Sequence, residues 1–114
     1  MRSTLSVLAI VFVSMAVPVS EARADDAQVK HGMDVYKTQK CSLCHIIAGV
    51  GKKHELDGVG AKLNADQIRE WLTHPKDAAA KAKSTAKPVM KDYSKLPKED
   101  LDALVAYMQT LTKK

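Results

Sequence analysis

The chain has 114 residues, two cysteines and a formal net charge of +5. A chain of this length forms one domain, and a domain this small usually depends on a disulfide, a metal or a cofactor for its stability. The lysines are dispersed rather than clustered. This pattern argues against nucleic acid as the partner, and the basic excess favours acidic proteins or substrates.

The N-terminus has the pattern of a secretory signal peptide. A positively charged start precedes an apolar run that ends at Val19, and Ala-Arg-Ala at 22–24 supplies a cleavage site. We therefore expect a signal peptide at 1–24, a mature domain at 25–114, and export to the periplasm. The alternative is an uncleaved membrane anchor. Pro18 interrupts the apolar run, however, and the run is shorter than the roughly 20 residues that a membrane span needs.

Three segments have the periodicity of amphipathic helices. The first is Asp26–Lys37, with apolar residues at i, i+4 and i+7. The second is Asn64–Thr73, where Asn64 and Gln67 form a capping box and Pro75 prevents extension. The third is Pro97–Thr112, with a continuous apolar stripe, acidic residues in its first turn and lysines just after its end.

The rest of the mature chain contains no segment that predicts a strand. A short helical turn is expected at 78–80, after the second helix. Two loops remain, at 46–63 with four glycines and at 81–96 with one proline. Both are long for a small domain, and long loops of this kind usually surround a functional site.

The motif that carries the chemistry is Cys41-Ser42-Leu43-Cys44-His45, which matches the C-x-x-C-H signature of covalent haem attachment. Two sulfurs at this spacing reach the two vinyl groups of one porphyrin and form thioethers. The histidine that follows then lies under the ring, where its imidazole binds the iron. Cys41 and Cys44 are therefore predicted to hold one haem c, with His45 as an axial ligand.

Two other interpretations of the cysteines are open. A redox-active dithiol normally accompanies a βαβ pattern, which is absent here. A zinc site requires further ligands with matching spacing, and the chain contains no third cysteine. A disulfide between positions three apart would close a very small loop and add little stability.

The mature chain resembles the class I cytochromes c over essentially its whole length. Gly32 and Tyr36 match a glycine and an aromatic residue that the family carries on its first helix. Leu104 and Tyr107 match the Leu-x-x-Tyr element of its last helix, and residues 71–76 match its aromatic-Leu-x-x-Pro-Lys stretch. The resemblance implies an all-α cytochrome c fold, with three main helices around one covalently bound haem. It also implies that the last helix crosses the first at Gly32.

The resemblance further implies that a methionine in the loop before the last helix is the second axial ligand of the iron, and Met90 occupies that position. Met33 and Met108 lie on apolar helix faces, where methionine is usually packing material. His54, His74 or an open coordination site are the alternatives. Histidine–methionine ligation raises the reduction potential, and with both positions filled the iron has no vacancy for a gas or peroxide.

One departure from the family concerns the hydrogen bond that orients the ligating histidine. Many members have Gly-Pro before a leucine in the first loop, and the proline carbonyl accepts this bond. The corresponding segment here, 57–63, has no proline. A carbonyl of this segment, such as that of Val59, is expected to take its place.

Six further side chains are expected near the haem because of their positions in the chain. Trp71 is a candidate haem contact, although plain packing explains it equally well. Five lysines flank the two loops and are either ordinary surface residues or a basic ring that guides acidic redox partners: Lys52, Lys53, Lys76, Lys87 and Lys91.

We therefore expect a monomeric, non-enzymatic carrier that transfers one electron at a time between redox proteins. Two other functions are open. The first alternative is a haem subunit of a larger oxidoreductase. The second is a gas-binding or sensing haem protein with an open or labile sixth coordination site.

Overall fold

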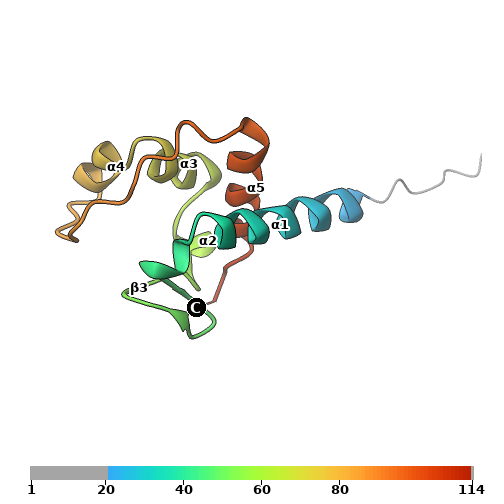
Figure 1. The fold of residues 1–114 in the computed structure, drawn as a ribbon, viewed down its shortest axis with the longest axis horizontal. Coiled ribbons are helices and arrows are strands. Elements are labelled where there is room, and N and C mark those ends of the chain that lie inside the picture. Colours follow the sequence, from blue (N-terminus) through green and yellow to red (C-terminus); the bar gives the residue numbers. More distant parts are fainter. Residues whose placement is uncertain (1–20, 114) are drawn as a thin grey trace, which may run out of the picture.

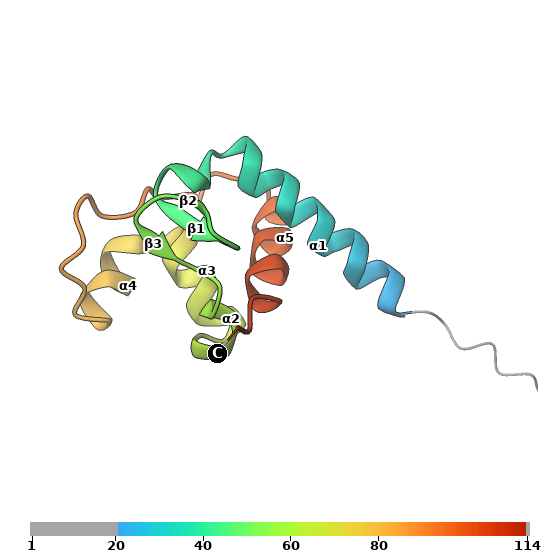
Figure 2. The same ribbon diagram turned by 90° about the horizontal axis from the view of Figure 1, so that it is seen from below.

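The computed structural model describes residues 21–113, which are mostly helical with one small sheet (Figures 1 and 2). The helices are α1 (Glu21–Thr38), the one-turn 3-10 helix η1 (Cys41–Leu43), α2 (Val59–Lys62), α3 (Ala65–Thr73), α4 (Pro75–Lys81) and α5 (Lys98–Gln109). The strands are β1 (His45–Ile47), β2 (Val50–Gly51) and β3 (His54–Glu55). The expected signal peptide lies outside the described residues, apart from its last four positions in α1. No helix within 21–113 has the length and apolar character that a membrane crossing requires.

Helices α1 and α5 cross in close contact (Figure 1). A Cβ atom at Gly32 would lie 2.1 Å from the carbonyl oxygen of Ala103, so the backbones can approach only because residue 32 has no side chain. The rings of Tyr36 and Tyr107 meet edge to face beside the crossing, with their centroids 5.9 Å apart. His31 Nε2 lies 2.7 Å from Asp100 Oδ1 on the same contact. The crossing expected at Gly32 is therefore present.

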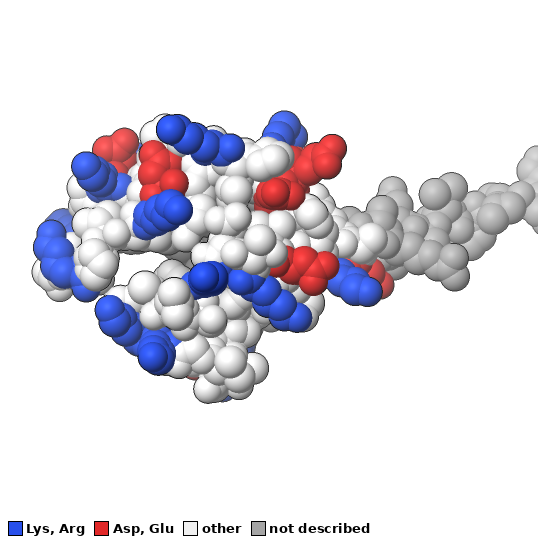
Figure 3. Space-filling view, viewed as in Figure 1, with Lys and Arg blue, Asp and Glu red and all other residues white. Residues whose placement is uncertain are grey.

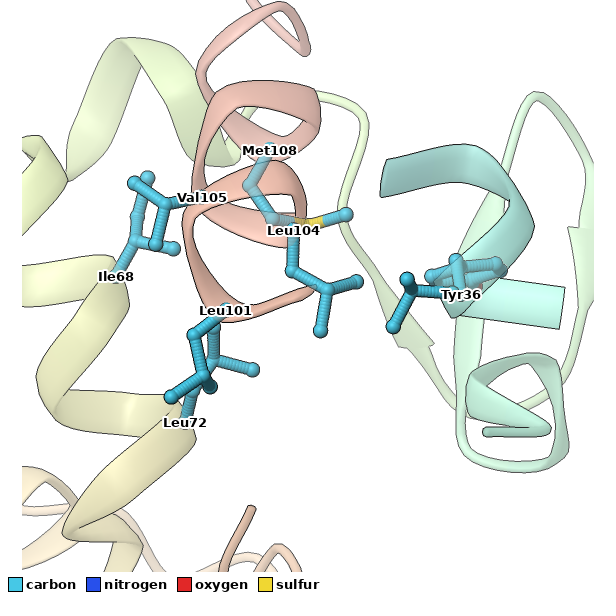
Figure 4. Packing of buried hydrophobic residues seen from close by; sticks show 8 residues of the cluster. Tyr36, Ile68, Leu72, Leu101, Leu104, Val105 and Met108 are labelled. Carbon is cyan, nitrogen blue, oxygen red and sulfur yellow. The ribbon is translucent and has the colours of Figure 1, made fainter. Parts of the chain in front are cut away.

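The hydrophobic core lies on both sides of α5 (Figure 4). Leu104 points toward Tyr36 of α1, and Val105 points toward Ile68 of α3. Leu104 is 2% exposed and Ile68 is 3% exposed. Burial of each such aliphatic side chain contributes about 1.5–3 kcal/mol. The described core thus joins the two ends of the chain to the middle helix through the apolar stripe of α5.

The helix α3 begins and ends as the sequence predicts. The side-chain oxygen of Asn64 accepts a hydrogen bond from the backbone N–H of Gln67 at 2.9 Å, and the Gln67 side chain accepts one from the N–H of Asn64 at 2.9 Å. The helix stops at Thr73, and Pro75 begins α4. The turn expected at 78–80 is part of this longer helix. The next segment, 82–97, contains no helix or strand, as expected.

Helix α5 is shorter than the predicted Pro97–Thr112. Pro97 precedes the helix with an extended ψ of 144° instead of occupying its first turn. The C-terminal end unwinds after Gln109 because the tail is drawn toward α2. The N–H of Gly60 donates to the carbonyl of Leu111 at 2.8 Å, and the N–H of Lys113 donates to the carbonyl of Asp57 at 2.9 Å.

The prediction that the chain has no strand is wrong between residues 45 and 55. Strand β1 pairs antiparallel with β2 and parallel with β3, in the order β2-β1-β3. These strands have only two or three residues, too few for an alternating pattern to be visible in the sequence. The turn between β1 and β2 depends on positive φ angles at Ala48 (50°) and Gly49 (78°).

Candidate functional site

The two cysteines lie in a tight connection between α1 and the sheet. Lys40 adopts the left-handed conformation, with φ of 57°, and directs the chain into η1. The N–H of Cys44 donates to the carbonyl of Cys41 at 3.1 Å, which keeps both thiols on one turn. Cys41 is half-buried, Cys44 is exposed, and the two form no disulfide. The turn therefore presents two unbridged thiols directly before β1, whose first residue is His45.

The environment of Cys41 does not suit a redox-active dithiol. Burial raises the pKa of the Cys41 thiol to about 11. Reactive thiols require the opposite shift, because the thiolate is the nucleophile. Within the part of the chain that the structure describes, no group of three histidine, cysteine or acidic side chains is arranged to hold a metal ion. Neither alternative interpretation of the C-x-x-C pair gains support from this geometry.

His45 begins β1 with a partly buried imidazole. Burial lowers the pKa of its ring and favours the neutral form, which is the form that binds metals. Its Nδ1 atom is buried and has no hydrogen-bond partner. The expected bond from a carbonyl of 57–63 is therefore not present, and the carbonyl of Val59 accepts from the N–H of Leu63 at 2.9 Å within α2.

His54 lies beside His45 and not opposite it. The two residues are paired in the parallel register of β1 and β3, and their ring centroids are 6.1 Å apart. Paired residues on neighbouring strands project to the same face of a sheet. This arrangement disfavours His54 as an opposing axial ligand. His74 is exposed at the junction of α3 and α4, where its Nδ1 lies 2.9 Å from the hydroxyl of Thr73.

Met90 is half-buried and packs against the core cluster. Its loop is fixed to α3 by a bond from the N–H of Tyr93 to the carbonyl of Leu72, at 2.7 Å. The pKa of Tyr93 is raised, mainly by burial and then by the charges of Cys41 and Cys44. Cys41 packs against the same core cluster, so the Met90 loop and the cysteine turn are both attached to it.

Comparison with known proteins identifies the family of this chain. Residues 29–112 match the family model described as Cytochrome c. The chain belongs to the cytochrome c family. No curated protein and no solved structure gives a significant match. Membership confirms the resemblance noted from the sequence and makes this a haem-based electron-transfer protein, because the family binds haem c covalently.

The residues present in this cytochrome fit that cofactor. Two unbridged thiols and a histidine with a neutral, partly buried ring follow one another on a single turn and strand. A thioether also suits the buried position of Cys41, because it carries no charge in a site that disfavours the thiolate.

Trp71 occupies a different environment from the other predicted site residues. It lines a cavity of about 250 Å³ between α3 and α4, together with Leu63, Gln67, Glu70, Ala78, Lys81 and Ala82. The indole is half-buried and is not among the apolar residues packed against the core. A contact with haem stays a prediction for this residue.

Three residues near the site make contacts that the sequence does not predict. Tyr93 joins the Met90 loop to α3, and Asp57 binds the turn after β1, where its Oδ1 accepts from the N–H of Ala48 at 2.7 Å. Gly51 (φ of 120°) permits β2 to approach β1, because a Cβ there would lie 1.8 Å from the carbonyl oxygen of His45. Gly51 and Asp57 are visible in the sequence only as loop residues, since both contacts depend on a sheet that the sequence does not predict.

Proposed function

We propose that this protein is a one-electron carrier with a single haem c, which is held by thioethers from Cys41 and Cys44 and ligated by His45 and Met90. The observation that carries the proposal is that Cys41 and Met90, which belong to two different loops, both pack against the same hydrophobic core cluster. Tyr93, three residues after Met90, also packs against this cluster and fixes the Met90 loop to α3. The three main helices, α1, α3 and α5, would then form the wall around the cofactor.

The bound haem supplies an iron centre that changes its oxidation state by one electron. The protein's own residues set the conditions for that change. With a neutral His45 and the thioether of Met90 as its ligands, the iron would have no free coordination position, and the thioether would favour the reduced state. The reaction needs no proton transfer and no covalent step. We therefore propose a carrier and not an enzyme.

The surface supports transfer to an acidic partner. Figure 3 shows a hollow between the part that contains α3 and α4 and the part that contains the sheet, with basic side chains on both sides of its opening. Lys52 and Lys53 lie in the turn between β2 and β3, Lys76 lies on α4, and Lys87 and Lys91 flank Met90. All five are exposed. Positive charge on both sides of an opening favours encounter with acidic surfaces.

The leader pattern at 1–24 supports a periplasmic location, in which the mature chain passes electrons between redox proteins as a monomer. The N-terminal sequence of the protein purified from its natural source tests this part of the proposal. A mature protein that begins at Asp25 supports cleavage and export. Retention of Met1 in a membrane fraction contradicts it.

Substitution of Met90 tests the ligand assignment. We expect Met90→Ala to lower the reduction potential by more than about 100 mV, because the thioether that favours ferrous iron is lost. We also expect ferrous Met90→Ala to bind carbon monoxide rapidly at neutral pH, whereas the parent protein does not. The measurements are an absorption spectrum, a redox titration and stopped-flow carbon monoxide binding.

Met33→Ala is the matched control, because Met33 lies 40% exposed on α1. It should leave the spectrum and the potential unchanged. An unchanged potential in Met90→Ala refutes the assignment of Met90. Rapid carbon monoxide binding by the parent protein favours a gas-binding function, and a partner that co-purifies in fixed proportion favours a subunit of a larger oxidoreductase.

A further inference from the structure

Strand β1 carries His45 and touches the helical core through Ile47 and through the weak contact of the Tyr36 hydroxyl with the His45 carbonyl, at 3.5 Å. It has only three residues, none of them fully buried. On one edge it pairs with β2, where Gly51 leaves no room for a Cβ atom beside the carbonyl oxygen of His45. On the other edge, the N–H groups of His54 and Leu56 donate to the carbonyls of Cys44 and Ile46, at 3.1 and 2.8 Å. The position of the His45 ring therefore depends on what holds the segment after β3.

Asp57 directly follows that segment and is held from the opposite side by the C-terminal tail. Its carbonyl accepts from the N–H of Lys113 at 2.9 Å. The next residue, Gly58, lies so close to the tail that a Cβ there would be 2.7 Å from the carbonyl oxygen of Lys113. Two residues later, the N–H of Gly60 donates to Leu111. The backbone of Asp57 is thus attached to the C-terminal tail, which follows α5 of the core.

The side chain of Asp57 points back to the sheet. Its Oδ1 accepts a hydrogen bond of 2.7 Å from the N–H of Ala48, the first residue after β1. This bond lowers the pKa of the Asp57 carboxyl below its usual range, so the carboxylate is charged at neutral pH. Ala48 and Gly49 both have positive φ, so the turn depends on bonds such as this one. The carboxylate makes a third contact between β1 and the 54–57 segment.

We propose that Asp57 is a positioning residue: its carboxylate holds the turn after β1 and, through β1, fixes the orientation of the His45 imidazole. The proposal rests on the assignment of His45 as an axial ligand. Groups outside the ligand shell that fix a histidine ring tune the metal it binds. In this protein the Asp57 side chain adds to the backbone bonds of β1 a link between the turn after β1 and the C-terminal tail.

The orientation of a ligating imidazole can be measured directly. In ferric haem proteins, the hyperfine-shifted proton resonances of the four haem methyl groups change when the imidazole plane rotates. We expect Asp57→Ala to shift these resonances and to change their spread. Asp57→Asn keeps an acceptor oxygen for the N–H of Ala48 but loses the charge, so it should retain the parent pattern. Asp34→Ala removes an exposed carboxylate on α1 and is the control.

The outcomes separate this proposal from the function on which it rests. Mass spectrometry and the pyridine haemochrome spectrum first establish whether haem c is attached, and a protein without haem contradicts the proposed function instead. With haem attached, unchanged methyl shifts in Asp57→Ala overturn the positioning role, even if that variant is less stable. Equal shifts in Asp57→Asn and Asp57→Ala also overturn it, because the charge and not the hydrogen bond would then be responsible.

A measurement on the unmodified protein keeps the proposal testable if Asp57→Ala does not mature. Ala48 is exposed, so its amide proton should exchange quickly unless the bond to Asp57 protects it. We expect exchange at least about tenfold slower than for an unbonded exposed amide, since exchange requires opening of the bond. Exchange at the unprotected rate contradicts the proposal.

Discussion

At the scale of single residues, burial controls the ionisation of the aromatic hydroxyl groups. Burial raises the pKa of Tyr36 to about 12, and it also raises the pKa of Tyr93 and of Tyr107. The hydroxyl of Tyr36 is only weakly engaged, since it lies 3.5 Å from the carbonyl oxygen of His45. Its resistance to ionisation therefore comes from the core and not from one strong hydrogen bond.

This environment predicts a loss of stability in alkaline solution. In the unfolded chain Tyr36 ionises near pH 10, whereas in the folded protein it ionises near pH 12. The stabilising effect is fully present below pH 10 and is lost as the pH rises toward 12. We expect the 13C resonance of the Tyr36 ring to titrate near pH 12, and Tyr36→Phe to reduce the fall in unfolding free energy between pH 10 and 12. Titration of Tyr36 near pH 10 contradicts this expectation.

The site residues that can be predicted from the sequence are the candidate ligands, whereas the residues that position them cannot be predicted. Cys41, Cys44 and His45 are recognisable because their spacing alone defines the chemistry. Met90 is recognisable from its place in the chain before the last helix. Asp57 is not recognisable, because its acceptor role depends on left-handed backbone at Ala48, nine residues earlier. Short-range patterns predict the ligands better than they predict the groups that position them.

At the scale of elements, the same distinction separates α3 from the sheet. The capping box at Asn64 acts within four residues, so the start of α3 can be predicted from the sequence. Strands β1 and β3 pair in parallel although a loop separates them in the chain, and no local sequence pattern predicts this pairing. Helix α5 ends at Gln109 and not at the predicted Thr112, because Leu111 and Lys113 bond to the α2 region, which is distant in the sequence. Contacts between elements decide these boundaries.

The crossing of α1 and α5 provides a test at this scale. We expect Gly32→Ala to lower the free energy of unfolding by about 1–3 kcal/mol, because the new methyl group would overlap the carbonyl of Ala103 and force the helices apart. The measurement is urea unfolding followed by circular dichroism at 222 nm. Gln28→Ala, at an exposed position on α1, is the control and should change stability by less than about 0.5 kcal/mol. Equal stability of Gly32→Ala and the parent protein would show that the helices are not in tight contact.

At the scale of the whole molecule, the core and the cysteine turn depend on each other. The core cluster joins α1, α3 and α5, while Cys41 and Met90 pack against its edge from two different loops. The Met90 loop is held to α3 by the bond from Tyr93 to Leu72, and the cysteine turn follows α1, where the N–H of Gln39 donates to the carbonyl of Val35 at 2.8 Å. A cofactor bound between them would therefore connect two loops that are attached to different helices.

The distribution of charge over the molecule gives the final prediction. Basic side chains lie on both sides of the hollow in Figure 3. If electrons pass through this opening, the rate of oxidation of the reduced protein by the hexacyanoferrate(III) anion should fall at least roughly tenfold between 10 mM and 300 mM salt, because salt screens the attraction. A cationic cobalt(III) phenanthroline complex should show the opposite trend. Replacing Lys52 and Lys53 by glutamine should weaken the salt dependence for the anion, whereas Lys30→Gln on α1 should not, since the latter lysine lies away from the sheet. A salt response equal for both reagents would mean that the lysines are ordinary surface residues, and that recognition of a partner depends on another part of the surface.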